Sequence, residues 1–268
     1  MRNSFLITCV AFLAASCSTY LQIGTLSSPD VTTNDRGEFT FSSPEVQISY
    51  NFWEEYGEMS FTVSNLSDND ITLDLAESFH IKNGLAEDYY RAREYSYSVK
   101  QASSYKSGSV ADAKNTTSII GASETINNGV QASVSYREKE RVIIPAHSAK
   151  QFKGFDVSRS PYRECGFRRD PSRKHDYSKK FTDKNSPLVI ENRLMFIING
   201  ERIPISNRFF ASEILNIKTS KATEEVQVKK CNGKPLKDKI TINLYARPDK
   251  YYILYSYSDV MSGGNDSF

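Results

Sequence analysis

Apolar residues alternate with polar residues in several short runs of the chain. In the run VQISYNFW, Val46, Ile48 and Tyr50 are each followed by a polar residue, and the runs MSFTV and ITLDL repeat the pattern. A period of two places successive side chains on opposite faces of an extended strand. Such runs are typical of antiparallel sheets with one buried face and one solvated face. The chain is therefore predicted to fold mainly as antiparallel β-structure.

Turn-forming residues separate these runs at short intervals. The pairs Asn83-Gly84 and Asn199-Gly200 tolerate the positive φ angles of a type I′ turn, so each predicts a β-hairpin. Pro248-Asp249 can occupy the centre of a third turn, within ITINLYARPDKYYILYSY. Many short strands with frequent turns indicate an all-β, antiparallel β-sandwich, immunoglobulin-like or related. The 16 Tyr and 15 Phe suit this class, because aromatic side chains pack well on pleated sheets.

The sequence also separates this β-domain from less regular segments. We expect the sandwich to cover residues 45–218, and residues 219–268 to form a C-terminal β-hairpin and a polar tail. Residues 96–135 are rich in Ser, Ala, Asn, Gly and Lys, and contain few large apolar side chains. They predict a long loop within the sandwich, and loops of that length are usually functional or disordered.

The first residues have the pattern of an export signal. Arg2 precedes an uncharged, mostly apolar run from Phe5 to Ala15, which is shorter than the ~17–25 residues of a membrane-spanning helix. Small residues end the run directly before Cys17, and the stretch LAASC at 13–17 resembles the lipobox of bacterial lipoproteins. We expect cleavage to remove residues 1–16 as a signal peptide. An ordinary secretory signal or a buried N-terminal helix is the alternative.

Cys17 is the expected lipid attachment residue. Its thiol can carry a thioether-linked diacylglycerol, and cleavage frees its amine for a further acyl chain. Two or three chains hold a protein on a membrane far more firmly than one chain, which binds only marginally. Residues 17–44 are polar and contain Pro29 and Gly37 as breakers, so we expect them to form a lipidated tether.

Two cysteines remain beyond the expected cleavage site, Cys165 and Cys231. Disulfides persist in exported proteins, and two thiols allow one intramolecular pairing. The alternative is two separate free thiols. Sequence alone leaves both open, because it does not show whether the two Cα atoms lie within the ~7 Å that a disulfide needs.

A basic segment from Arg159 to Lys180 is the most distinctive polar stretch. It holds eight Lys and Arg residues against three acidic residues. We interpret it as a candidate anion-facing patch for phosphates, headgroups, acidic glycans or an acidic partner, and the alternative is a solvated loop. The residues proposed for the patch are Arg163, Arg168, Arg169, Arg173 and Lys174.

The sequence contains no constellation that predicts a catalytic or metal site. The three histidines, His80, His147 and His175, are far apart and lack the short pairings of zinc sites. No G-x-S-x-G elbow marks a nucleophile, and no glycine-rich loop could hold a phosphate. We therefore expect no cofactor and no enzymatic activity. The near balance of 34 basic and 32 acidic residues gives no electrostatic case for nucleic acid.

Several segments resemble a group of Bacteroidetes cell-envelope lipoproteins. They include CSTYLQIGTLSS, ISYNFWEEYGEMSFTVSNLSDNDITLDLAESFHIKNGLAEDYY, RECGFRRDPSRK, NSPLVIENRLMFII and NRFFASEILNI, and cover most of residues 17–218. The group has no assigned activity, so the resemblance implies a location in the cell envelope and no mechanism. The residues directly after Cys17 are not acidic, which favours an anchor on the periplasmic side of the outer membrane over the cell surface.

Three functions follow as hypotheses. The leading one is a non-enzymatic binding module, held to the membrane through acyl chains on Cys17, with an envelope protein or glycan as partner. The second is a carbohydrate- or peptide-binding lipoprotein with a small-ligand pocket. The third is an envelope hydrolase that uses His147 or His80 with distant carboxylates. A deep pocket with a histidine would favour the hydrolase. An aromatic platform would favour sugar binding, and a flat apolar or basic face would favour a protein or membrane partner.

Overall fold

A computed structural model describes residues 19–100, 123–124, 131–172, 174–229, 231 and 234–256. Several expectations fall outside these residues: the signal peptide, Cys17, Arg173, most of the loop expected at 96–135, and the end of the C-terminal tail. The regular structure of the described residues is almost all β-strand, with one four-residue helix, α1, at Thr219–Ala222. None of its helical residues belongs to a segment long and apolar enough to span a bilayer.

The chain divides into two compact units, each built from segments distant in sequence. The first unit contains residues 1–63, 150–190 and 207–268. Its elements include β1 (Thr19–Ser27), β2 (Thr32–Thr33), β3 (Phe39–Ser42), β4 (Val46–Asn51), most of β5 (Ser60–Asn65), most of β12 (Ala149–Phe152), β13 (Tyr177–Lys180), α1, β16 (Thr223–Lys229), β17 (Pro235–Asn243) and β18 (Lys250–Ser256).

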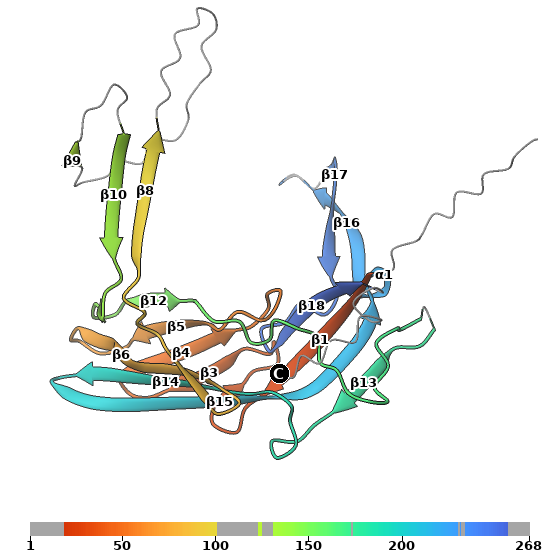
Figure 1. Cartoon of the computed structure of the whole chain (residues 1–268), viewed down its shortest axis with the longest axis horizontal. Coiled ribbons are helices and arrows are strands. Elements are labelled where there is room, and N and C mark those ends of the chain that lie inside the picture. The colour runs from red at the N-terminus through yellow and green to blue at the C-terminus, as the bar shows by residue number, and fades with distance from the viewer. Residues whose placement is uncertain are drawn as a thin grey trace, which may run out of the picture. The chain divides into compact units, whose positions relative to one another are not determined.

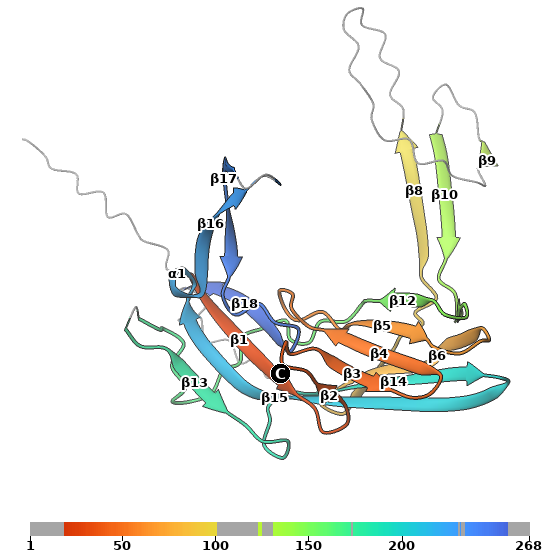
Figure 2. The same ribbon diagram turned by 180° about the vertical axis from the view of Figure 1, so that it is seen from behind.

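The second unit contains residues 64–149 and 191–206. Its strands are β6 (Ile71–Lys82), β7 (Leu85–Asp88), β8 (Glu94–Lys100), β9 (Ser123–Glu124), β10 (Gln131–Arg137) and β11 (Arg141–Ile144). Two long strands, β14 (Val189–Ile198) and β15 (Glu201–Lys218), contribute residues to both units. Figures 1 and 2 label most of these elements from opposite sides.

The strands form antiparallel sheets, which confirms the predicted all-β, sandwich-like fold class. The largest sheet has the order β11-β6-β14-β15-β1-β18, with β13 added on β15 and β7 on β6. A five-stranded sheet has the order β12-β5-β4-β3-β2, and the remaining sheets are β8-β10-β9 and the pair β16-β17.

The core of the first unit lies between two of these sheets. The ring of Phe209 on β15 lies 4.8 Å from that of Tyr50 and 5.0 Å from that of Phe52, while Phe39 lies 5.2 Å away. The predicted alternation explains this core, because Ile48 and Tyr50 are buried on one face of β4. Aromatic pairs with tilted or edge-on rings add to the stability from burial.

The turn signals predicted two hairpins correctly. Asn83 and Gly84 have φ angles of 48° and 84° between the paired strands β6 and β7. Asn199 and Gly200 have φ angles of 51° and 84° between β14 and β15, which are neighbours in the largest sheet. Asn and Gly tolerate the left-handed backbone at these positions, as a type I′ turn requires.

The tether expected at residues 17–44 is wrong for its described part. β1 lies inside the largest sheet, with β15 on one side and β18 on the other. Tyr20, Leu21, Gln22 and Ile23 are all buried, so both faces of this strand are covered. A strand covered on both faces needs no alternation of apolar and polar residues, so the period-two signal is absent from this segment. The sandwich therefore extends beyond the predicted limits of 45–218.

The pairing expected at the C-terminal end is also wrong. A hairpin does form within residues 219–268, but it joins β17 to β16, while β18 pairs with β1. The backbone N–H of Leu26 donates to the carbonyl of Asp249 at 2.8 Å, which fixes the turn before β18 beside the end of β1. β18 therefore pairs with the distant strand β1 and not with β17, the strand before it in the chain. The ends of the loop expected at 96–135 are strands, since β8 pairs with β10.

Candidate functional site

The basic segment is fixed to the largest sheet by the buried side chain of Gln22. Its Nε2 donates to the carbonyl of Tyr162 at 3.2 Å and to Oδ1 of Asn216 at 2.9 Å, and its Oε1 accepts from the N–H of Tyr162 at 2.5 Å. Asn216 in turn donates to the carbonyl of Arg168 at 2.8 Å. Buried amides paired in this way hold a loop in one place, because breaking them leaves polar groups unsatisfied.

An aromatic cluster and an ion pair support the same segment. The ring of Tyr162 lies 5.9 Å from that of Phe167 and 5.6 Å from that of Phe181. Burial, together with a hydrogen bond to Glu164, raises the pKa of Tyr162. Lys179 and Tyr162 both donate to Glu164 and lower the pKa of its carboxyl. The carboxylate of Glu164 is therefore paired within the segment, with the ammonium group of Lys179 and the hydroxyl of Tyr162.

The arginines of the segment do not form one uniform patch. Arg168 donates to the carboxylate of Asp170 at 2.9 and 3.2 Å and lies over the ring of Tyr177 at 5.1 Å, so a neighbouring charge balances it. Burial and the positive charge of nearby Arg163 lower the pKa of Arg169. The two guanidinium groups are therefore close enough for the charge of Arg163 to act on Arg169.

The other predicted patch residues add little to this pair. Lys174 is exposed, and Arg173 lies outside the described residues. Three further cations of the region are held in ion pairs: Arg159 with Asp156, Lys179 with Glu164, and Lys221 with Asp176. The anion-facing patch therefore stays a prediction.

The disulfide that the sequence left open is not formed in the structure. Cys165 and Cys231 are both free, exposed thiols. Cys165 lies in the basic segment, whereas Cys231 lies in the turn that connects β16 to β17. Each cysteine therefore offers a solvent-accessible thiol.

The two histidines considered for a hydrolase lie in different environments. His80 on β6 is buried, and burial together with the charges of Lys82 and Arg91 lowers its pKa to about 4. His147 lies 3.0 Å from Asp68, but the side chains of both are mostly exposed. No group of three potential metal ligands occurs among the residues that the structure describes.

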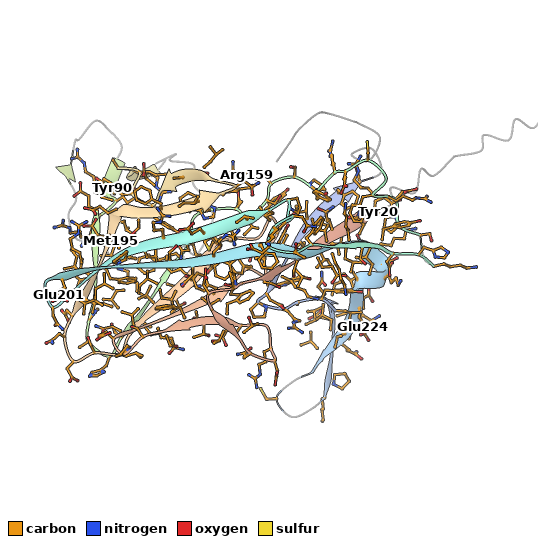
Figure 3. The ribbon with its side chains drawn as sticks, turned by 90° about the horizontal axis from the view of Figure 1, so that it is seen from below. Tyr20, Tyr90, Arg159, Met195, Glu201 and Glu224 are labelled. Carbon is orange, nitrogen blue, oxygen red and sulfur yellow. The ribbon has the colours of Figure 1, made fainter. Side chains whose placement is uncertain are left out.

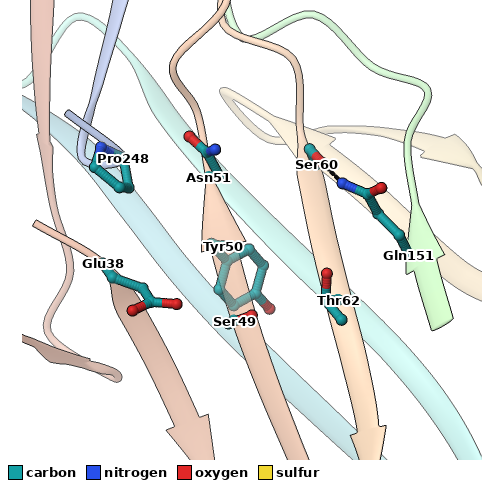
Figure 4. A pocket seen from close by; sticks show the side chains of 8 residues that line it. All are labelled: Glu38, Ser49, Tyr50, Asn51, Ser60, Thr62, Gln151 and Pro248. Carbon is teal, nitrogen blue, oxygen red and sulfur yellow. Dashed lines mark hydrogen bonds between the residues drawn. The ribbon is translucent and has the colours of Figure 1, made fainter. Parts of the chain in front are cut away.

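A polar cleft of about 240 Å³ lies on the solvent face of the five-stranded sheet (Figure 4). The period-two pattern places Ser49 and Asn51 of β4, and Ser60 and Thr62 of β5, opposite the core face of each strand, whereas the ring of Tyr50 lies in the core. The lining consists of Glu38, Ser49, Tyr50, Asn51, Ser60, Thr62, Gln151 and Pro248. It thus combines hydroxyl groups, two carboxamides and one carboxylate.

Neighbouring residues orient several of these polar groups. Gln151 Nε2 donates to Ser60 Oγ at 3.1 Å, which joins β12 to β5 across the cleft wall. Asn51 Oδ1 accepts from the N–H of Trp53 at 3.0 Å, which leaves its Nδ2 to donate elsewhere. The carboxylate of Glu38 accepts from Asn34 at 3.1 Å. Donors and acceptors held in this way can bind a ligand that carries both kinds of group.

Sequence reasoning missed this cleft. The signal is present in the polar half of the alternating runs, where Ser49 and Asn51 follow each other on β4, and Ser60 and Thr62 on β5. The missing information is that Gln151 of β12 lies beside Ser60 of β5, 91 residues earlier in the chain. No local pattern predicts a pairing over this sequence distance.

Comparison with known proteins adds no assignment. No family model, no curated protein and no solved structure matches this chain. The function is therefore argued from the residues of this chain.

Proposed function

We propose that this protein is a lipid-anchored, non-enzymatic module of the bacterial cell envelope that binds a glycan in the cleft on its five-stranded sheet. The anchor is the acylated Cys17 of the lipobox. The observation that supports the binding role best is the lining of the cleft, with six hydrogen-bonding side chains: Glu38, Ser49, Asn51, Ser60, Thr62 and Gln151.

The chemistry of the lining favours a hydroxyl-rich ligand. Small-molecule sites are usually lined mainly by apolar side chains and have volumes of ~300–1,000 Å³. This cleft is polar and, at about 240 Å³, smaller, so it accommodates one unit of a longer ligand. Each sugar hydroxyl both donates and accepts, which matches a lining of carboxamides, hydroxyls and a carboxylate.

Binding is favoured over hydrolysis by the number of carboxylates. Most glycoside hydrolases use two carboxyl groups that flank the scissile bond. Among the described residues that line the cleft, Glu38 is the one acid, and none is a histidine or cysteine. A bound sugar would therefore be held without the acid–base pair that cleavage needs.

Binding of the purified protein to polysaccharides from its own cell envelope tests this proposal. Asn51→Ala with Gln151→Ala should weaken binding at least about tenfold, because each lost hydrogen bond leaves a polar group of the ligand unsatisfied. Gln47→Ala is the matched control, since Gln47 lies on the same face of β4 and does not line the cleft.

Two results would contradict the proposal. Equal binding by the wild type and the double variant would remove the cleft from the binding site. Release of sugar from the polysaccharide by the wild type, abolished in Glu38→Gln, would replace binding by hydrolysis.

A further inference from the structure

The single tryptophan of the chain, Trp53, belongs to an aromatic pair on the surface of the first unit. The centroid of its ring lies 5.0 Å from that of Tyr252 on β18, and the two ring planes are inclined at 40°. Both side chains are partly exposed, whereas their chain neighbours Phe52 and Tyr251 are buried. Aromatic rings that lie side by side and partly exposed are typical of surfaces that bind a ligand.

The fold holds this aromatic pair in place. The segment that follows Trp53 pairs with β18, because Tyr56 donates its N–H to the carbonyl of Tyr252 at 2.8 Å. The Tyr252 side chain packs on a buried cluster that includes Ile23, its cross-strand neighbour on β1. Figures 1 and 2 show β18 beside β1, and Figure 3 labels Tyr20 near the start of β1. A side chain fixed in this way loses little conformational freedom when a ligand binds.

Two carboxylates lie near the same pair. Tyr252 donates its N–H to the carbonyl of Glu54 at 3.3 Å, and Glu55 forms a β-bridge with Tyr252. Burial, together with the charges of Glu55 and Glu54, raises the pKa of Tyr252, so its hydroxyl stays protonated at neutral pH. Carboxylates accept hydrogen bonds and a protonated hydroxyl donates one. The flat rings therefore have hydrogen-bonding groups beside them.

A third aromatic side chain nearby already has a partner. Tyr245 packs on the same buried cluster as Tyr252, and the ammonium group of Lys250 lies 5.4 Å from the centroid of the Tyr245 ring. A cation over an aromatic face interacts favourably with it, so this ring is engaged within the protein. The aromatic platform therefore consists of Trp53 and Tyr252.

The polar cleft on the five-stranded sheet ends beside this platform. Asn51, which lines the cleft, accepts from the N–H of Trp53 at 3.0 Å, and two positions along a chain separate their Cα atoms by at most about 7 Å. Phe52 between them is buried, so Asn51 and Trp53 point to the same solvent side. Pro248 lies at the same end of the cleft (Figure 4), and its carbonyl accepts from the N–H of Phe52 at 2.9 Å. Tyr252 follows Pro248 by four residues, so the cleft and the platform are contiguous.

We propose that the aromatic platform is a second subsite for the glycan, on which one pyranose ring stacks while a neighbouring unit of the same glycan chain occupies the cleft. One face of a pyranose ring presents C–H groups that pack on a flat aromatic ring, and its hydroxyls reach hydrogen-bonding groups at the edge. Glu54, Glu55 and the hydroxyl of Tyr252 are such groups. This inference rests on the glycan-binding role proposed above, and it restricts the ligand to glycans of two or more units.

The fluorescence of Trp53 tests this subsite directly, because the chain has no other tryptophan. The probes are polysaccharide from the protein's own cell envelope, and oligosaccharides and single sugars made from it by partial acid hydrolysis. The polysaccharide and the oligosaccharides should change the emission saturably, because a stacked sugar ring replaces water on the indole face. Single sugars should bind at least about tenfold more weakly, because each occupies one subsite at a time.

Calorimetry with the oligosaccharides tests the two rings by substitution. Tyr252→Leu should lower the affinity at least about fivefold, because leucine keeps an apolar contact with the core but has no flat ring. Trp53→Phe, which keeps a flat ring, should bind more tightly than Trp53→Leu. Tyr177→Leu is the matched control and should change the affinity by less than about twofold, because Tyr177 is a partly exposed tyrosine of the same unit whose ring lies under Arg168 at 5.1 Å.

The outcomes separate the platform from the cleft. Oligosaccharide binding with unchanged Trp53 emission, or with equal affinity for single sugars, would overturn the platform and leave the cleft standing. Equal losses in Tyr252→Leu and Tyr177→Leu would do the same. A saturable emission change that Tyr252→Leu abolishes, but that Asn51→Ala with Gln151→Ala leaves intact, would contradict the cleft and support the platform. Binding of none of the three probes would overturn both.

Discussion

Gly24 lies in the middle of β1, directly opposite Tyr251 of β18. The ring of Tyr251 is buried and occupies the space that a side chain at position 24 would need. Burial also raises the pKa of Tyr251, because a charged phenolate is poorly solvated there. A glycine at this position therefore allows a large aromatic ring to cover the sheet.

We expect Gly24→Ala to lower the free energy of unfolding by about 1–3 kcal/mol, because the added methyl group overpacks the core against Tyr251. Thermal and urea denaturation measure the change. Thr25→Ala, at the next position of the same strand, is the control and should cost less. An unchanged midpoint for Gly24→Ala would show that the Tyr251 ring moves aside freely.

His80 predicts a pH dependence of stability. Its pKa is about 4 in the folded protein and about 6.5 in an unfolded chain, so the unfolded chain binds more protons between these values. The free energy of unfolding should therefore fall as the pH is lowered from about 6.5 to about 4. The loss should reach about 2 kcal/mol near pH 5.

His80→Phe removes this titration and should flatten that part of the stability curve. Urea denaturation at about pH 7 and about pH 5 measures the slope in both proteins. A variant that keeps the whole wild-type slope would show that His80 does not cause it.

At the scale of elements, Gln22 connects β1 to the basic segment. Gln22→Leu removes its three hydrogen bonds and should cost about 1–3 kcal/mol, because the backbone groups of Tyr162 lose buried partners. Hydrogen exchange should accelerate for residues 160–169 of the basic segment. Gln47→Leu, on the solvent face of β4, should leave this exchange unchanged. Unaltered protection in the Gln22 variant would show that other contacts hold the segment.

Local sequence patterns correctly predicted strands and hairpins whose signals lie within a few consecutive residues. Alternation predicted β4, β5 and β6, and Asn-Gly pairs predicted two hairpins, because these signals act over a few residues. β1 was missed because both of its faces are covered, so its buried positions include Gln22 and Gly24 as well as apolar residues. The partner of β17 was missed because β18 finds a distant strand, β1.

At the scale of the whole molecule, the sheet order depends on pairings that the sequence does not announce. β1 starts at residue 19 and lies between β15 and β18, which start at residues 201 and 250. The cleft likewise gathers residues from β4, β5 and β12 together with Glu38 and Pro248. The sequence could therefore predict the fold class and candidate residues, but not the cleft.

The proposed role also concerns the whole molecule. We propose a glycan-binding module that acyl chains on Cys17 hold against the envelope membrane. The strand that begins two residues after Cys17 gives this anchor a structural consequence, because the fold would lie directly on the lipid surface. Cys17→Ala should release the protein from the membrane fraction or leave it as an uncleaved precursor. Membrane retention of a cleaved Cys17→Ala protein would assign the attachment to another part of the chain.

The most direct test is the mass of the N-terminal peptide of the protein extracted from its own membranes. We predict that residues 1–16 are absent and that Cys17 is the first residue, carrying a thioether-linked diacylglycerol and a further acyl chain. An unmodified Cys17, or a chain that begins at another residue, would contradict the lipid anchor.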